Sequence, residues 1–479
     1  MKQEGQFRKS LNLFDAAAIA MGSMIGSGIF IVSADIARNV GAPGWLLVVW
    51  IIAAVMTVMA AASYGELSGM MPRSGGVYVY LREAYSPLFG FLYGWTLFLV
   101  IQTGIIAAVG MAFAKFSGVI IPWISEANVL FEAGPVKIHT TLLVTIASIL
   151  FLTWINTLGI REGKRVQNIF TYSKVLILLI LIALGIYMAS QSSHGIFQSP
   201  GFWDAARFEN GTFIPIAGTA LVVAIGISMV GALFSSDAWY NITFASEEVI
   251  NPRKTIARSV ILGTMVVGVL YMLTNLVYVM GLPVRGLPGG ASVIDRGIAF
   301  AGEDRVGTAF ISGIFGRNAE MLMAVVVMIS TFGCNNGIIL SGARVYYAMA
   351  RDNLFFSRTG RLNRKGVPAF GLWIQAGWSI LLCLTGTYSQ LLDYVIFAAL
   401  LFFMMTIGAI FVLRIKWPDR ERPFKAIGYP VIPALYILLC LTIVIILLIN
   451  KPLFTWPGLI IVLSGVPVYF VWRKISVKQ

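Results

Sequence analysis

The sequence is poor in charge, in cysteine and in histidine. Charged residues make up only 12% of the 479 residues, whereas hydrophobic residues make up 58%. With a mean hydropathy of +0.84, this composition excludes an ordinary soluble globular protein and predicts a membrane protein. The cysteines, Cys334, Cys383 and Cys440, all fall within apolar runs, so we interpret them as buried thiols.

Motifs of the common enzyme classes are also missing. The sequence has no Walker loop, no G-x-S-x-G elbow and no histidine-rich metal motif. We therefore expect no enzyme activity, no cofactor and no metal site. The net charge of +14 is scattered over short loops beside apolar runs, which indicates membrane topology and not nucleic-acid binding.

Apolar runs long enough to cross a bilayer recur along the whole chain. A spanning helix needs about 20 residues, and on that scale the sequence predicts twelve transmembrane helices. They cover residues 15–38, 44–70, 87–117, 139–159, 166–190, 215–248, 257–281, 318–349, 368–386, 390–413, 430–449 and 455–472. The first run continues past any cleavage site, so we expect a retained helix and not a signal peptide.

Lysine and arginine are concentrated in alternate connecting segments. With the N-terminus inside, the inner segments hold most of these residues, including the clusters at 351–365 and 414–425. This asymmetry predicts a multi-pass protein of the cell membrane with both termini in the cytoplasm.

The first span contains a stretch that weakens a helix. Residues 21–30 read MGSMIGSGIF, and a helix break within hydrocarbon is expected only where it faces protein or a wet cavity. Such a break offers amides that suit a carboxylate and carbonyls that suit an ammonium, the two charged groups of a free amino acid. The competing interpretation is close packing of small residues between helices.

The sixth span carries a second interruption, at Ser235, Ser236 and Asp237. Serine and aspartate compete with helical hydrogen bonds, and an ionisable residue at membrane depth indicates function by default. Breaks in spans one and six predict a transporter built from two inverted five-helix halves, with its site near the midplane. One transmembrane domain would then contain halves at about 12–190 and 213–414, followed by two last helices at about 430–473.

The inner end of the sixth span carries the charged residues Glu247, Glu248, Arg253 and Lys254. We expect them to form ion pairs that either gate the cytoplasmic side or hold the structure together.

Five motifs in order along the chain resemble the amino acid/polyamine/organocation superfamily, and within it bacterial members of the L-type amino acid transporter branch. The motifs are GSMIGSGIF (22–30), YGELSGMMPRSGGVYVYLREAY (64–85), NTLGIREGKRVQNIFTYSK (156–174), FASEEVINPRKTIARSV (244–260) and ARVYYAMARDNLFF (343–356). The resemblance implies an all-α fold like that of the LeuT-type transporters, with a 5+5 inverted repeat and helices one and six unwound around the substrate. It also implies sodium-independent exchange of neutral L-amino acids by alternating access.

The resemblance implies a substrate site position by position. The carboxylate of the amino acid would meet the amides and hydroxyl of helix one, and its ammonium would meet carbonyls of helices one and six. The aromatic ring of Phe234 would close the outer side of the site. The implied substrate-binding residues are Met24, Gly26, Ser27, Gly28, Phe234, Ser235 and Asp237.

Lys174 lies inside the fifth span, where a lysine must snorkel to the interface or find a polar cavity. The resemblance implies that its amine stands where related sodium symporters hold a sodium ion, and that it couples helix five to helices one and eight. A proton-carrying role is also compatible with a buried lysine.

Asp237 departs from the pattern of the branch, in which glycine is frequent at this place, and some relatives that accept cationic amino acids have an acidic residue there. Its carboxylate could pair with the substrate ammonium, with a cationic side chain or with Lys174. We expect neutral substrates, with proton-coupled symport, including cationic substrates, as the alternative. A channel or an amino acid sensor is an alternative of another class, but a channel would need a continuous pore with polar rings.

The resemblance also bears on partners. Animal members are joined to a single-span glycoprotein through a cysteine between spans three and four, but residues 116–139 hold no cysteine. We therefore expect an amino acid substrate and the lipid bilayer as partners, no disulfide-linked heavy chain, and a prokaryotic cytoplasmic membrane.

Overall fold

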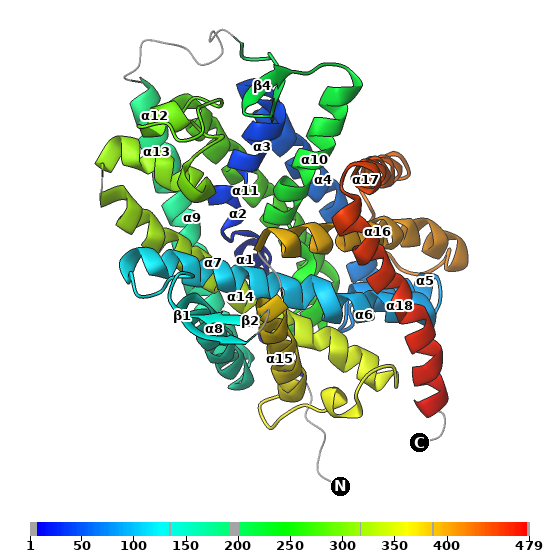
Figure 1. The fold of residues 1–479 in the computed structure, drawn as a ribbon. Helices are drawn as coiled ribbons and strands as arrows, with labels where there is room; N and C mark the ends of the chain where they lie inside the picture. The colour runs from blue at the N-terminus through cyan, green and yellow to red at the C-terminus, as the bar shows by residue number, and fades with distance from the viewer. Residues whose placement is uncertain (1–6, 134–135, 191–200, 317, 386–387, 477–479) are drawn as a thin grey trace.

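The computed structural model describes residues 7–133, 136–190, 201–316, 318–385 and 388–476. Long helices dominate this part of the chain, and the first helix lies near the centre of the bundle (Figure 1). Eleven described helices are long and apolar enough to cross a membrane, and a shorter apolar helix covers Ala369–Leu384. The prediction of twelve transmembrane helices is therefore confirmed.

The spans follow the predicted order. The first half of the chain forms α1 (Leu13–Met24) with α2 (Gly28–Ile31) and α3 (Ser33–Val40), α4 (Pro43–Met70), α6 (Pro87–Thr96) with η1 (Leu97–Ile101) and α7 (Gln102–Ile120), α8 (Thr140–Thr157) and α9 (Ile160–Ser190). The second half forms α10 (Thr219–Ser235) with η3 (Trp239–Glu248), α11 (Pro252–Gly281), α14 (Asn318–Arg351), α15 (Ala369–Thr385), α16 (Tyr388–Lys416), α17 (Val431–Asn450) and α18 (Pro452–Ser476).

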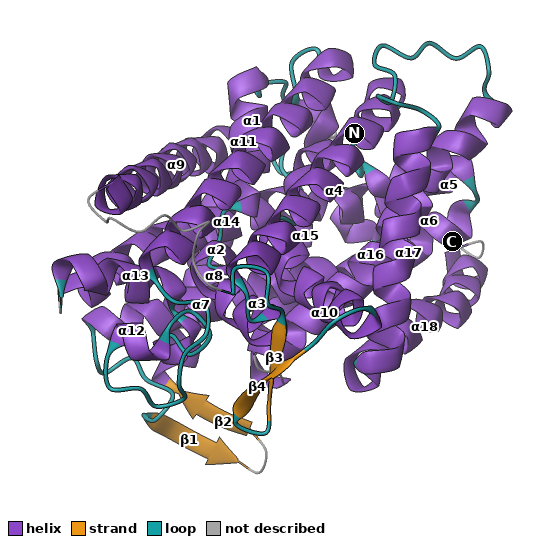
Figure 2. Cartoon of the chain, turned by 90° about the horizontal axis from the view of Figure 1, so that it is seen from above, coloured by secondary structure: helices purple, strands orange, loops and turns teal. Residues whose placement is uncertain are grey.

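Short elements connect these spans. They are α5 (Val77–Ala84), β1 (Val129–Ala133), β2 (Val136–His139), β3 (Ala206–Glu209), β4 (Thr212–Pro215), α12 (Val293–Arg296), η4 (Gly302–Asp304), α13 (Val306–Phe315) and η5 (Ser357–Gly360). Strands β1 and β2 form one antiparallel hairpin and β3 and β4 another. Both hairpins lie toward the same edge of the molecule in the view of Figure 2, on the side predicted to be extracellular.

The boundary of the fifth span differs from its prediction. We expected the helix to begin at about residue 166, but α9 begins at Ile160. The charged residues Arg161 to Arg165 stay helical because charge excludes a segment from hydrocarbon without excluding it from a helix.

Helices one and six are both broken, as predicted. Helix one is interrupted between Met24 and Gly28, and helix six between Ser235 and Trp239. The inner half of helix six, η3, is a 3₁₀-helix with a kink at Ala245, a form that the sequence did not predict. The division into repeat halves at about 12–190 and 213–414 stays a prediction.

A π-helical segment, η1, interrupts the third span, and the sequence gave no sign of it. Such a turn leaves a carbonyl without its usual helical partner. The indole of Trp378, on α15, donates to the carbonyl oxygen of Leu99 at 3.0 Å, which provides the missing partner.

The broken helix one is packed inside the other helices. Its inner half, α1, contacts α9, α11, α14 and η3. Gly22 makes the contact with α9 possible, because a Cβ atom at this position would lie 2.1 Å from Gln167 Nε2 and 2.1 Å from Thr171 Oγ1. At Gly22 the small residue therefore serves close packing.

Candidate functional site

A small cavity lies between the two helix breaks. The space open to the centre of a water molecule is about 20 Å³, room for roughly one water, so helices one and six must part to admit an amino acid. The cavity is lined by Ser23, Met24, Gly26, Ser27, Gly28, Ile105, Val109, Phe234, Ser235, Asp237, Ala238 and Cys334. We call this space the central cavity.

The structure brings the predicted substrate-binding residues together around the central cavity. Every one of them is among its lining residues: Met24, Gly26, Ser27, Gly28, Phe234, Ser235 and Asp237. The remaining predicted residue, Lys174, lies behind helix one, on α9. Helices distant in the sequence therefore meet at the two interruptions that the sequence indicates.

Gly26 and Gly28 lie at a close approach of three helices. A Cβ atom at Gly28 would lie 2.2 Å from the hydroxyl oxygen and 3.1 Å from the Cα atom of Ser235 in helix six. A Cβ atom at Gly26 would lie 3.2 Å from the sulfur of Cys334 on α14. The structure therefore shows the close packing of small residues at this break, and the same two glycines line the central cavity.

Lys174 caps the end of the inner half of helix one. Its ammonium nitrogen lies 2.5 Å from the carbonyl oxygen of Gly22, 2.6 Å from that of Ile25 and 3.3 Å from that of Ser330 on α14. The residue is only 1% exposed, so the side chain does not snorkel to the interface. These contacts join α9 to helix one and α14.

Other side chains bind the remaining carbonyl oxygens at this break. The hydroxyl of Ser330 lies 3.2 Å from the oxygen of Ile25 and 2.9 Å from that of Gly26, and the thiol of Cys334 lies 3.0 Å from the oxygen of Ser23. A helix end buried in hydrocarbon needs such partners.

Tyr271, on α11, connects the two breaks directly. Its hydroxyl lies 3.1 Å from the carbonyl oxygen of Met24 in helix one and 3.1 Å from that of Ser235 in helix six. The ring packs edge-on against Trp50 at 5.5 Å between centroids. The sequence does not indicate this residue, because a tyrosine in an apolar run carries no local pattern that identifies its partners.

Asp237 is buried beside the central cavity. Neither carboxylate oxygen has a side-chain partner among the described residues, although the backbone amide of Ala238 is nearby. No ion pair between Asp237 and Lys174 occurs in the described part of the chain. The hydroxyls of Tyr93 and Tyr240 are near enough to interact with the carboxylate electrostatically, so the group lies in a polar pocket within an apolar bundle.

A second small cavity opens on the other side of Asp237. Its lining residues are Thr57, Leu233, Ser236, Asp237, Trp239, Ile396, Leu400, Phe403 and Tyr436. The hydroxyl of Tyr93 and both polar atoms of the Asn241 side chain are buried without a hydrogen-bond partner among the described residues. Unpartnered polar groups of this kind are costly in a low dielectric.

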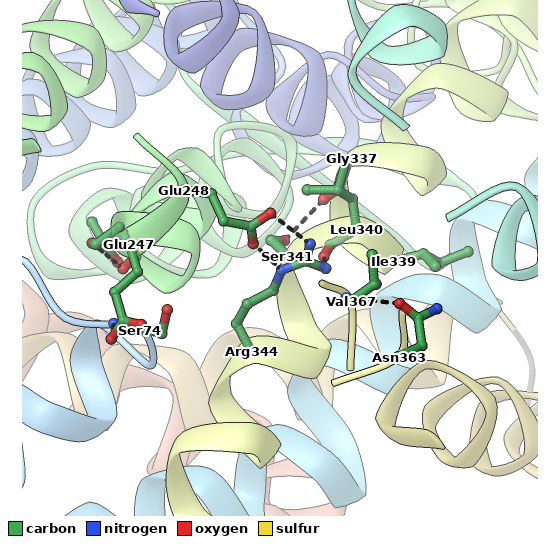
Figure 3. A network of polar contacts seen from close by, with 12 residues as sticks. Ser74, Glu247, Glu248, Gly337, Ile339, Leu340, Ser341, Arg344, Asn363 and Val367 are labelled. Carbon is green, nitrogen blue, oxygen red and sulfur yellow. Dashed lines mark hydrogen bonds and ion pairs between the residues drawn. The ribbon is translucent and has the colours of Figure 1, made fainter. Parts of the chain in front are cut away.

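Backbone hydrogen bonds and a buried ion pair close the side of the site that is predicted to face the cytoplasm. The amides of Ser10 and Leu11 lie 2.9 and 3.0 Å from the carbonyl oxygen of Glu248. The carboxylate of Glu248 faces Arg344 on α14 (Figure 3), with Nε 2.7 Å from one carboxylate oxygen and Nη2 3.2 Å from the other. Both side chains are buried.

The charged residues predicted to pair at the inner end of helix six have different partners. Glu247 accepts from the backbone amide of Ser74 at 3.1 Å, a contact that Figure 3 shows beside the Glu248 pair. Arg253 pairs at the surface with Glu421 at 2.8 Å. Arg344, which the sequence analysis quoted only inside a motif, is the partner that it did not identify.

A helical bundle with two spans broken around a central cavity is the arrangement expected of a membrane transporter. The amino acid permease family matches residues 11–472, and the chain belongs to this family. The predicted resemblance is thereby confirmed, and with it the prediction of an amino acid transporter.

Characterised relatives cover almost the whole chain. The large neutral amino acids transporter small subunit 2 of Rattus norvegicus is 31% identical over 469 residues, which are 97% of this chain and 80% of the relative. The b(0,+)-type amino acid transporter 1 of Mus musculus is 29% identical over 97% of this chain and 88% of its own length. The cystine/glutamate transporter of Homo sapiens is 26% identical over 99% of this chain and 87% of its own length.

Proposed function

We propose that this protein is a sodium-independent exchanger of neutral L-amino acids that works by alternating access. The observation that carries the proposal is the central cavity, which lies between two helix breaks and is lined by backbone of both. An amino acid bound there would place its carboxylate at the start of α2 and its ammonium near Met24 and Phe234, with polarity matched to the helix ends. Phe234 would close over it from outside.

Independence of sodium is supported by the position of Lys174. Carbonyl oxygens of Gly22, Ile25 and Ser330 surround its ammonium at 2.5 to 3.3 Å, in the manner of a bound cation. A fixed positive charge at this point would repel a sodium ion at short range. Lys174 would couple substrate binding at helix one to α9 and α14, since it contacts all three.

Neutral substrates are proposed because the wall of the central cavity has few charged groups. Asp237 favours a second candidate function, the transport of cationic amino acids, with coupling to protons as its energy source. A buried carboxylate without a side-chain partner is costly, and a cationic side chain or a proton would each neutralise it. The two candidates differ in whether the carrier returns without a substrate.

We further propose a bacterial cytoplasmic membrane as the location, with both termini in the cytoplasm. The alternation of basic residues along the chain supports this orientation. Transport without a disulfide-linked subunit is supported by the cysteines Cys334, Cys383 and Cys440, each of which is buried within the bundle.

Uptake into proteoliposomes tests the proposal. Purified protein is reconstituted with or without unlabelled amino acid inside, and labelled alanine, leucine and arginine are added outside, with sodium or choline as the cation. Exchange predicts uptake only into loaded vesicles, unchanged by sodium. Uptake into empty vesicles driven by external acid would overturn exchange in favour of proton symport, and sodium dependence would contradict the proposed role of Lys174.

A further inference from the structure

The outer half of helix one is held by an ion pair that the transport site does not use. Arg38, in the last turn of α3, lies with Nη1 2.6 Å from one carboxylate oxygen of Asp304 and Nη2 3.1 Å from the other. The same Nη1 lies 2.8 Å from the carbonyl oxygen of Ala299. A two-pronged contact of this kind fixes orientation as well as distance.

Asp304 belongs to the long outer connection between α11 and α14. A second contact joins this connection to the end of α3, since Nε of Arg285 lies 2.7 Å from the carbonyl oxygen of Gly41. Downstream, α13 contacts α2. The connection therefore touches the outer half of helix one at several points, and none of these contacts involves the inner half.

The backbone of the outer connection is strained at the ion pair. Glu303 and Asp304 are adjacent and both adopt left-handed conformations, with φ of 52° and 59°. Residues other than glycine occupy this region at a cost and keep it only where their surroundings hold them there. Arg38 holds Asp304, and Arg305 holds Glu303 at 2.6 Å.

We propose that Arg38 and Asp304 form an outer latch, and that the central cavity opens to the outside only when this pair separates. The inference rests on the alternating access proposed above. Separation would release the end of α3 and let the strained turn relax, so that the connection has two discrete arrangements instead of a continuous range. Loss of the pair and relief of strain offset one another, which keeps the two states close in free energy.

The outer latch is more exposed than the ion pair that holds the inner half of helix one. Asp15 pairs with Lys164 at 2.9 Å, and their side chains are 7% and 23% exposed. The side chains of Asp304 and Arg38 are 42% and 27% exposed. Salt screens exposed pairs more than buried ones, so higher ionic strength outside should favour outward opening.

Cys334 provides a readout of outward opening that needs no substrate. Its thiol lines the central cavity and is 3% exposed, so a reagent outside reaches it only when the outer side opens. In cells that express the Cys383→Ala, Cys440→Ala protein, a membrane-impermeant thiosulfonate is added outside and the rate of Cys334 modification is measured. Asp304→Asn removes the charge, and asparagine still tolerates the left-handed backbone.

In the Asp304→Asn and Arg38→Gln variants we expect the reagent to modify Cys334 roughly two- to fivefold faster. This range corresponds to the free energy of a half-exposed ion pair. Glu132→Gln is the matched control, because Glu132 pairs with Lys137 at 2.7 Å on the β1–β2 hairpin. Salt should accelerate labelling of the protein with the pair intact and leave Asp304→Asn unchanged.

Labelling of both single variants at the rate of the Glu132→Gln control would overturn the latch, as would equal salt effects with and without the pair. Amino acid exchange is measured in the same proteins after reconstitution. Absence of exchange in all of them would contradict the proposed function, whereas the labelling rates would still decide the latch.

Discussion

The ammonium nitrogen of Lys174 lies 2.6 Å from the carbonyl oxygen of Ile25, the residue at which the inner half of helix one ends. A charge-assisted hydrogen bond at a helix terminus is strong in a low dielectric, and opposite charges of helix end and lysine add to it. The contact therefore joins α9 to the break in helix one.

Replacement of Lys174 by methionine keeps an unbranched side chain one atom shorter and removes its charge. We expect exchange to slow at least tenfold, because two carbonyl oxygens lose a charged donor at a cost of roughly 1.5–3 kcal/mol each, while the order of preferred substrates stays the same. Initial exchange rates for several amino acids measure this. Lys137→Met, on the exposed hairpin, is the control, and equal turnover of the two variants would refute the coupling role.

Tyr271 provides a test of the link between the two breaks. Tyr271→Phe removes only the hydroxyl that contacts Met24 and Ser235, and we expect exchange to fall about fivefold, since the one O–H proton shared between the two carbonyl oxygens contributes about 1 kcal/mol. Tyr278→Phe on the same helix is a matched control, because that buried hydroxyl has no hydrogen-bond partner among the described residues. The idea fails if the two variants transport equally well.

Gly28 tests the close approach of helices one and six. In Gly28→Ala the new methyl would lie 3.1 Å from the backbone of Ser235 as well as 2.2 Å from its hydroxyl, so the helices must move apart. We expect loss of exchange in a protein that still inserts and remains monodisperse in detergent. Gly377→Ala on α15 is the control, because nothing lies within 4 Å of its position.

A second substitution, at Ser235, makes the test at Gly28 specific. Ser235→Gly removes the side chain that the new methyl would meet, so the double variant Gly28→Ala, Ser235→Gly should recover part of the activity. Full activity of Gly28→Ala alone would show that the approach of the two breaks is unimportant.

The carboxylate of Asp237 tests the substrate class. If it faces a cationic side chain, Asp237→Asn should lower arginine exchange about tenfold or more, since a hydrogen bond to a charged group contributes roughly 1.5–3 kcal/mol, and alanine exchange should change little. Competition of unlabelled arginine against labelled alanine measures the ratio. Equal losses for both amino acids would assign Asp237 to the common ammonium group, and no change would exclude it from binding.

The pair Glu248 and Arg344 tests the inner closure through stability. Arg344→Gln leaves a buried carboxylate unpaired, which costs about 3–5 kcal/mol, so the apparent melting temperature in detergent should fall by many degrees. The neutral double variant Glu248→Gln, Arg344→Gln should recover most of it. Arg165→Gln, which breaks an exposed pair with Glu162, should leave the melting temperature unchanged.

The sequence predicted the spans and both breaks, because apolar length, glycine and buried aspartate are local signals. It did not predict which side chains satisfy the broken backbone. Ser330, Cys334 and Tyr271 come from helices far along the chain, and their roles depend on the distances between helices after packing. The π-helical turn of the third span was not predicted for a similar reason, since the carbonyl oxygen of Leu99 is bound by Trp378 from a distant span.

The 3₁₀ form of η3 lengthens this half of the sixth span. A 3₁₀-helix rises about 2.0 Å for each residue and an α-helix about 1.5 Å. The 10 residues of η3 therefore extend over about 20 Å, a length that needs about 13 residues in α form. The 17 residues of α10 extend over about 26 Å in α form, so the two halves together exceed a hydrocarbon core of about 30 Å and the interruption does not leave the span short.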